Sequence, residues 1–172
     1  NPDVTLNLTM FNRQPIHPDV NKILGDFTNI ALLGYYARED FNFMEIVESM
    51  KMQLWNAIEY RSFNVINLLG RLAEKHGDAV AAPYVFTSLI DSDAEGTEQT
   101  MTKIGFEEIF AQTQTPQVVL DHQLYVRNGK LLLVLDYVKQ AFDNEILDEL
   151  FVDYTSRVKR LADMEDWSML YE

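Results

Sequence analysis

Asp121 stands in the middle of a stretch, QVVLDHQLY, whose other residues are typical of a β-strand. Alternate residues of a strand point to opposite faces, so Gln117, Asp121, Gln123 and Tyr125 are expected to share one face. That face is a polar stripe, whereas the opposite face is mostly aliphatic. A carboxylate on such a stripe suits a lined cleft, where it can transfer protons as a general acid or base. Asp121 is therefore the first catalytic candidate.

Thr87, in the apolar stretch PYVFTSLI, is a second candidate. Its hydroxyl can orient a substrate or a carboxylate, although a threonine does not readily act as a base by itself. Spacing alone leaves another interpretation open for both residues. In that interpretation Asp121 caps a turn or faces water, and Thr87 is an ordinary strand threonine, because β-branched residues favour strands.

The three histidines are scattered along the chain. His17 lies in a turn-like segment beside prolines, His76 ends a predicted helix, and His122 points away from Asp121 if the strand is regular. The chain has no cysteine, which excludes disulfides, thiolate nucleophiles and thiolate metal ligands. We therefore expect no metal site, and we assign His122 a structural role.

The charge of the chain limits its partners. Twenty-seven acidic and fourteen basic side chains give a formal net charge of -13, which repels phosphate backbones and anionic membrane surfaces. The longest apolar runs, such as LLLVL, are much shorter than the roughly 20 residues that span a bilayer. We therefore expect neither nucleic acid nor a membrane as a partner. The lack of cysteine is compatible with a reducing compartment, and we expect a cytoplasmic location.

The elements that would position these residues follow from hydrophobic periodicity. Strands separated by helices, together with one hairpin, predict an α/β fold in which a mixed β-sheet is flanked by helices. The sequence RNG predicts the hairpin turn, because Asn and Gly tolerate positive φ. Residues 97–113 show no clear period and are expected to be irregular. Strands are predicted at 3–11, 27–36, 83–90, 116–126 and 130–138, and helices at 43–58, 64–76 and 144–162.

Five stretches of the chain resemble, in order and spacing, motifs of the heterocyclization domains of nonribosomal peptide synthetases. They are TLNLTMFNRQPIHPDV, LGDFTN, APYVFTSLI, QTPQVVLDHQLY and NGKLLLVLDYV. The resemblance covers nearly the whole chain and corresponds to the C-terminal half of such a domain. It implies one lobe of a chloramphenicol-acetyltransferase-like fold, in which two lobes form a V around an active-site tunnel. We expect residues 1–172 to be the C-terminal lobe without its N-terminal lobe, and to be inactive alone.

The resemblance also implies a reaction and roles for single residues. Such domains condense an acyl or peptidyl thioester with a carrier-bound cysteine, serine or threonine, and then cyclodehydrate the product to a thiazoline or oxazoline. By resemblance, Asp121 is the acid or base of cyclodehydration and Thr87 orients it or the adduct. Asn12, in FNR, is implied to bind a carbonyl or amide, and Gln117 is a weaker substrate-binding candidate.

The partners implied by the resemblance are the N-terminal lobe, the upstream and downstream peptidyl carrier domains and an adenylation domain. The lobe itself is expected to bind no cofactor, since the phosphopantetheine arms belong to the carrier domains. Two alternatives stay open: the C-terminal lobe of an amide-forming condensation domain, and a non-catalytic binding or scaffold module. The coding sequence upstream of residue 1 would discriminate between the first interpretation and the last.

Overall fold

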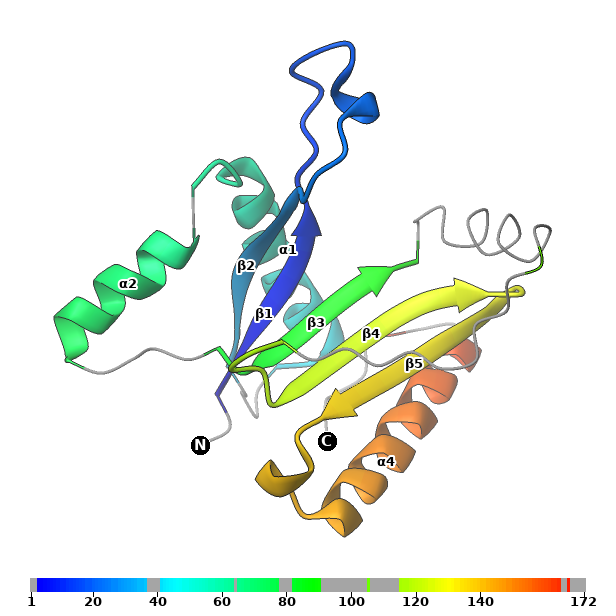
Figure 1. The fold of residues 1–172 in the computed structure, drawn as a ribbon. Coiled ribbons are helices and arrows are strands. Elements are labelled where there is room, and N and C mark those ends of the chain that lie inside the picture. Colours follow the sequence, from blue (N-terminus) through cyan, green and yellow to red (C-terminus); the bar gives the residue numbers. More distant parts are fainter. Residues whose placement is uncertain are drawn as a thin grey trace. The chain divides into compact units, whose positions relative to one another are not determined.

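The computed structural model describes residues 3–36, 41–63, 65–77, 82–90, 105, 115–164 and 167. The chain divides into two compact units, of which the first comprises 1–82 with 167–172 and the second comprises 83–166. Each unit contains strands and helices (Figure 1). The predicted α/β class is confirmed.

The first unit is built on an antiparallel pair of strands. β1 (Val4–Phe11) pairs with β2 (Thr28–Tyr35) from Val4 opposite Tyr35 to Phe11 opposite Thr28. A short 3-10 helix, η1 (Val20–Lys22), lies in the loop between them. Ala31 and Leu33 are the buried residues of β2, and they alternate as residues on one face of a strand do.

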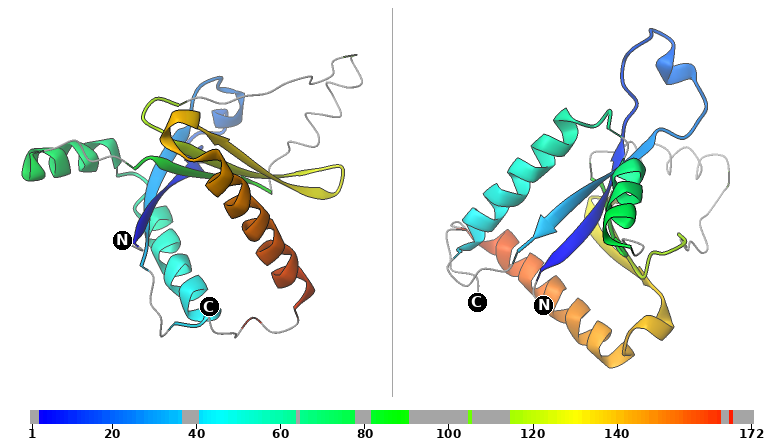
Figure 2. Two further views of the ribbon diagram at one scale, coloured as in Figure 1. Left: turned by 90° about the horizontal axis from the view of Figure 1, so that it is seen from below. Right: turned by 90° about the vertical axis from the view of Figure 1, so that its left-hand side faces the viewer.

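Helix α1 (Phe43–Glu59) contacts β2, and Figure 2 shows it beside the β1–β2 pair. The Gln53 side chain joins helix and strand by two hydrogen bonds. Its Nε2 donates to the Gly34 carbonyl at 2.8 Å, and its Oε1 accepts from the Gly34 amide at 2.8 Å. The helix begins with a capping box, in which the Asn42 side chain accepts from the Glu45 amide and the Glu45 carboxylate accepts from the Asn42 amide. The chain therefore fixes both the start and the seating of α1.

Helix α2 (Val65–His76) follows in the same unit and also contacts β2. It ends where the sequence predicts. Gly77 has a φ of 79° and its amide donates to the Ala73 carbonyl at 2.8 Å. Glycine adopts this left-handed conformation without steric cost, which is why it ends helices so often.

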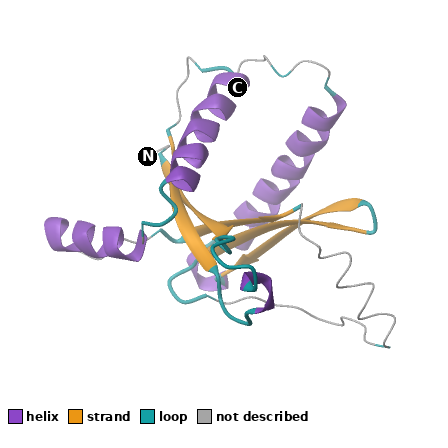
Figure 3. Ribbon diagram, turned by 90° about the horizontal axis from the view of Figure 1, so that it is seen from above, coloured by secondary structure: helices purple, strands orange, loops and turns teal. Residues whose placement is uncertain are grey.

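The second unit contains a mixed sheet of β3 (Tyr84–Leu89), β4 (Leu120–Arg127) and β5 (Lys130–Tyr137). β3 and β4 are parallel, and β4 and β5 are antiparallel. Asn128 and Gly129 make the predicted turn, with φ of 53° and 70°. Helix α4 (Asn144–Asp163) follows the 3-10 helix η2 (Lys139–Ala141) and begins at Asp143, whose side chain accepts from the Glu145 amide. Figure 3 shows α4 beside these strands, and its Leu147 is buried.

The prediction for the start of β4 is wrong. The expected strand included Gln117, but Gln117 has a φ of 69° and lies in a turn closed by a hydrogen bond from the Val118 amide to the Thr115 carbonyl. The amides of Val119 and Leu120 then donate to the Pro83 carbonyl, and the strand begins at Leu120. The prediction for 97–113 lies outside the described residues, apart from residue 105.

None of the helices within the described ranges is long and apolar enough to span a membrane.

Candidate functional site

One face of strands β3, β4 and β5 in the second unit carries a group of polar side chains. In the parallel pairing, Asp121 is opposite Val85 and Gln123 is opposite Thr87. In the antiparallel pairing, Asp121 is opposite Asp136. Residues directly opposite in a sheet point to the same side, so Thr87, Asp121, Gln123 and Asp136 share one face. We call these four residues the polar row.

The opposite face of β4 is apolar and meets α4. The His122 ring stacks on Phe86 with centroids 5.2 Å apart, and the Tyr154 ring of α4 meets it edge-on at 5.2 Å. Burial lowers the pKa of His122, and the negative charge of Asp121 acts in the other direction. The predicted orientation of His122, away from Asp121, is confirmed. The polar row therefore lies on the face of the sheet that α4 does not cover.

Within the polar row, Asp121 and Gln123 are joined directly. Gln123 Nε2 donates a hydrogen bond to Asp121 Oδ2 at 3.1 Å. Both side chains are partly buried, as are Thr87 and Asp136. Partial burial strengthens the electrostatic interactions of such groups relative to those in bulk water. The row thus offers a carboxylate held by an amide, a second carboxylate opposite it, and a hydroxyl on the neighbouring strand.

The sequence predicted Asp121 and Thr87 as candidates, but not the hydrogen bond of Gln123 or the position of Asp136. A signal for Asp136 was present in the turn. Two residues, Asn128 and Gly129, separate the strands, and this spacing alone sets Arg127 opposite Lys130 and hence Asp121 opposite Asp136. Gln123 was counted on the stripe, but spacing did not predict its hydrogen bond to the carboxylate.

Asn12 belongs to the first unit, at the end of β1. Its Nδ2 donates to the Arg61 carbonyl at 3.4 Å, and its Oδ1 accepts from Gln14 Nε2 at 3.2 Å. The same Arg61 carbonyl accepts from Asn29 Nδ2 at 2.7 Å. Asn12 thus ties the strand end to the turn after α1, and its substrate-binding role stays a prediction. Gln117, in its turn before β4, is exposed and is not part of the polar row.

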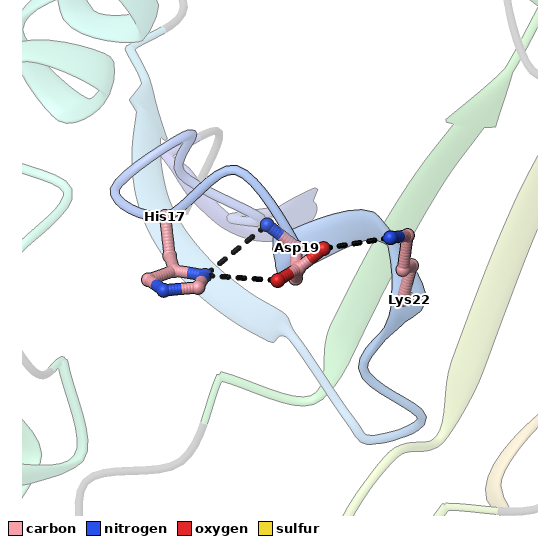
Figure 4. Close-up of polar contacts among 3 residues, drawn as sticks. All are labelled: His17, Asp19 and Lys22. Atoms are coloured by element: carbon pink, nitrogen blue, oxygen red, sulfur yellow. Dashed lines mark hydrogen bonds and ion pairs between the residues drawn. The ribbon is translucent and has the colours of Figure 1, made fainter.

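The loop between β1 and β2 holds His17 in an exposed cluster (Figure 4). His17 Nδ1 accepts from the Asp19 amide at 3.1 Å, and Lys22 Nζ lies 2.7 Å from Asp19 Oδ1. Exposed pairs of this kind contribute little to stability. The contacts agree with the prediction that His17 is a turn residue. No cluster of three or more potential metal ligands occurs among the residues that the structure describes.

A cavity of about 500 Å³ lies within the first unit, beside β2 and helices α1 and α2. Its walls are mainly apolar, with Met10, Ile30, Phe63 and Leu68 among them. Neither Asp121 nor Thr87 lines it. The cavity is therefore separate from the two predicted catalytic residues.

No family model matches the chain. Among curated proteins it is 33% identical to bacitracin synthase 1 of Bacillus licheniformis over 96% of the chain, and 32% identical to phenyloxazoline synthase MbtB of Mycobacterium sp. (strain MCS) over 91%. It is 31% identical to pyochelin synthetase PchE of Pseudomonas aeruginosa over 92% of the chain. The chain spans only 3%, 13% and 11% of the lengths of these three relatives.

Solved structures give the same result. The EpoB cyclization-docking bidomain from Sorangium cellulosum is 36% identical, with a TM-score of 0.80 over 97% of this chain and 33% of that one. The nonribosomal peptide synthetase FmoA3 is 32% identical, with a TM-score of 0.84 over all of this chain and 18% of that one. The first condensation domain of the CDA synthetase, at 16% identity and a TM-score of 0.59, shares the fold. The chain is therefore homologous to part of the heterocyclization-type nonribosomal peptide synthetases.

Proposed function

We propose that residues 1–172 form the C-terminal lobe of a heterocyclization domain in a nonribosomal peptide synthetase. The whole domain condenses an acyl or peptidyl thioester with a carrier-bound cysteine, serine or threonine, and cyclodehydrates the product to a thiazoline or oxazoline. Identity to the EpoB cyclization-docking bidomain and to a phenyloxazoline synthase supports the proposal. The observation that carries it is the polar row, which brings Asp121 and Thr87 to one face of the sheet.

The chemistry of ring closure explains why a carboxylate is needed. The thiol or hydroxyl side chain attacks the new amide carbonyl and gives a tetrahedral adduct that carries a hydroxyl group beside the nitrogen. Water is lost when the nitrogen gives up its proton, the C=N bond forms, and the C–O bond breaks as the hydroxyl takes a proton. One carboxylate can accept the first proton and deliver the second, so it ends the cycle as it began. We assign this role to Asp121.

Thr87 suits a supporting role in this step. It lies on the strand next to Asp121, two residues beyond the residue that pairs with it, so the two side chains are diagonal neighbours on one face. A hydroxyl can donate to one atom and accept from another, and can therefore hold the adduct hydroxyl near the carboxylate. The partners proposed for the lobe are the N-terminal lobe, the two flanking carrier domains with their phosphopantetheine arms, and an adenylation domain.

The test compares products of the intact synthetase carrying Asp121→Asn or Thr87→Ala. Asn keeps the shape of the side chain but removes the proton acceptor, and Ala removes the orienting hydroxyl. We expect linear product to accumulate in both, because loss of a general acid or base costs on the order of a hundredfold to ten-thousandfold in the step it serves. Mass spectrometry separates linear from cyclized product by one water.

Asp148→Asn is the control, since Asp148 is exposed on α4, outside the polar row. It should leave both products unchanged. Equal loss of linear and cyclized product in the Asp121 variant, with folding intact, would assign the carboxylate to structure or to condensation. That result would favour the alternative of an amide-forming condensation domain.

A further inference from the structure

We propose that Gln123 is a positioning residue for cyclodehydration, acting through the Asp121 carboxylate. The inference rests on the proposed function and deepens it. Gln123 Nε2 donates to Asp121 Oδ2 at 3.1 Å, and the two residues are alternate positions on one face of β4. The hydrogen bond fixes the rotation of the carboxylate about its Cβ–Cγ bond. It therefore decides where the carboxylate oxygens lie when the adduct arrives.

Asp136 places a second acidic side chain next to Asp121. Asp136 is directly opposite Asp121 across the β4–β5 pair, and like charges directly opposite each other in a sheet repel. The Gln123 amide offers Asp121 a neutral donor along the strand, and hydrogen bonds to a charged group are the stronger kind. Gln123 thus keeps the carboxylate on the polar row against this repulsion.

Gln123 also lies beside Thr87. The two residues are directly opposite in the parallel pairing of β3 and β4. Gln123 is therefore next to both proposed catalytic residues. It is hydrogen-bonded to Asp121 and directly opposite Thr87 in the strand pairing. A carboxylate and hydroxyl that must act on one adduct need a fixed separation, because small misplacements reduce rates strongly. The geometry predicts that Gln123 affects ring closure more than condensation.

The experiment measures cyclized and linear product from the intact synthetase carrying Gln123→Met or Gln123→Glu. Met keeps the length of the side chain without a donor, and Glu replaces the donor by an acceptor while keeping the side chain polar. Both should lower the ratio of cyclized to linear product by about tenfold to a hundredfold, the value of one hydrogen bond to a charged group. Gln140→Met is the matched control, because Gln140 is exposed in η2. It should leave the ratio unchanged.

A double variant separates positioning from a general structural role. If Gln123 acts through the carboxylate, Gln123→Met combined with Asp121→Asn should lose no more ring closure than Asp121→Asn alone. Losses that multiply would overturn the inference. So would an unchanged ratio in both single Gln123 variants while Asp121→Asn blocks ring closure, and the proposed function would then stand. An unchanged ratio in Asp121→Asn would overturn the proposed function itself.

Discussion

Asp121 and His122 are sequence neighbours with opposite surroundings. Asp121 lies on the polar row with Gln123, whereas the His122 ring lies against Phe86 and Tyr154. Burial lowers the pKa of His122 and raises the pKa of Tyr154, because apolar surroundings favour the uncharged form of each group. Because successive residues of a strand point to opposite faces, the carboxylate of Asp121 and the packed ring of His122 are separated although they are adjacent in the sequence.

The lowered pKa of His122 predicts that acid destabilises the protein. The unfolded chain takes up a proton near the ordinary histidine pKa of about 6.5, whereas the folded chain does so only at lower pH. The contribution of His122 to the unfolding free energy is therefore constant above about pH 6.5. It declines as the pH falls from about 6.5 to the pKa of His122 in the folded chain.

Urea unfolding of the wild-type chain and of His122→Phe between about pH 5 and pH 8 checks this. Phe keeps an aromatic ring beside Phe86 and Tyr154 but does not titrate. The difference in unfolding free energy between the two chains should change by at most about 1.4 kcal/mol per pH unit, in the direction that favours the variant as the pH falls. A difference that stays constant with pH would contradict the prediction.

At the scale of elements, the sequence predicted the described helices and strands because their apolar residues repeat with clear periods. The prediction failed at the start of β4, where the backbone leaves the extended conformation although the side-chain pattern of a strand continues. Gln117 has positive φ, which is uncommon for glutamine and cannot be predicted from its residue type. The predicted strand therefore begins too early and includes Gln117 on the face of Asp121. Asp121 and Thr87 lie within the predicted strands, but their shared face depends on the register between β3 and β4, which periodicity does not specify. The bond from Gln123 depends on side-chain rotamers, which periodicity does not specify.

Helix α4 provides a matched pair of leucines. Leu147 is 6% exposed and Leu150 is 50% exposed. Leu147→Ala should lower the unfolding free energy of the second unit by about 2 to 5 kcal/mol, because it removes buried methyl groups and leaves a cavity. Leu150→Ala should change it by about 0.5 kcal/mol or less, as is usual for exposed positions. Urea unfolding followed by circular dichroism measures both, and equal effects would show that α4 does not bury the face containing Leu147.

At the scale of the whole molecule, both units expose large apolar side chains. Trp55 and Phe63 are 61% and 50% exposed in the first unit, and Ile146 and Val152 are 63% and 65% exposed in the second. Exposed apolar side chains favour contacts with other protein when they lie close together. The net charge of -13 opposes contact between copies of the chain. The motifs predicted the family from the chain alone, but this surface followed only from the structure.

These opposing effects predict that the chain self-associates more strongly as salt is added. Salt screens the repulsion between acidic copies over a distance of about 10 Å at 0.1 M, while apolar contacts persist. Sedimentation equilibrium at increasing protein and salt concentrations should show the average mass rising above 19.9 kDa. A mass that stays at that value, or that falls with salt, would contradict the prediction.

The turn at Asn128 and Gly129 has a consequence for how the protein tolerates insertions. With two residues in the turn, Arg127 is opposite Lys130 and every later pair on β4 and β5 follows from that count. One amino acid added to the turn and absorbed by slippage of β5 would move Asp136 to the face that α4 covers and bring an aliphatic neighbour opposite Asp121. A change in the length of the turn would thus change the residue opposite Asp121, although the turn itself does not contact Asp121 in the strand pairing. The length of this turn is therefore tied to the pairing of β4 with β5.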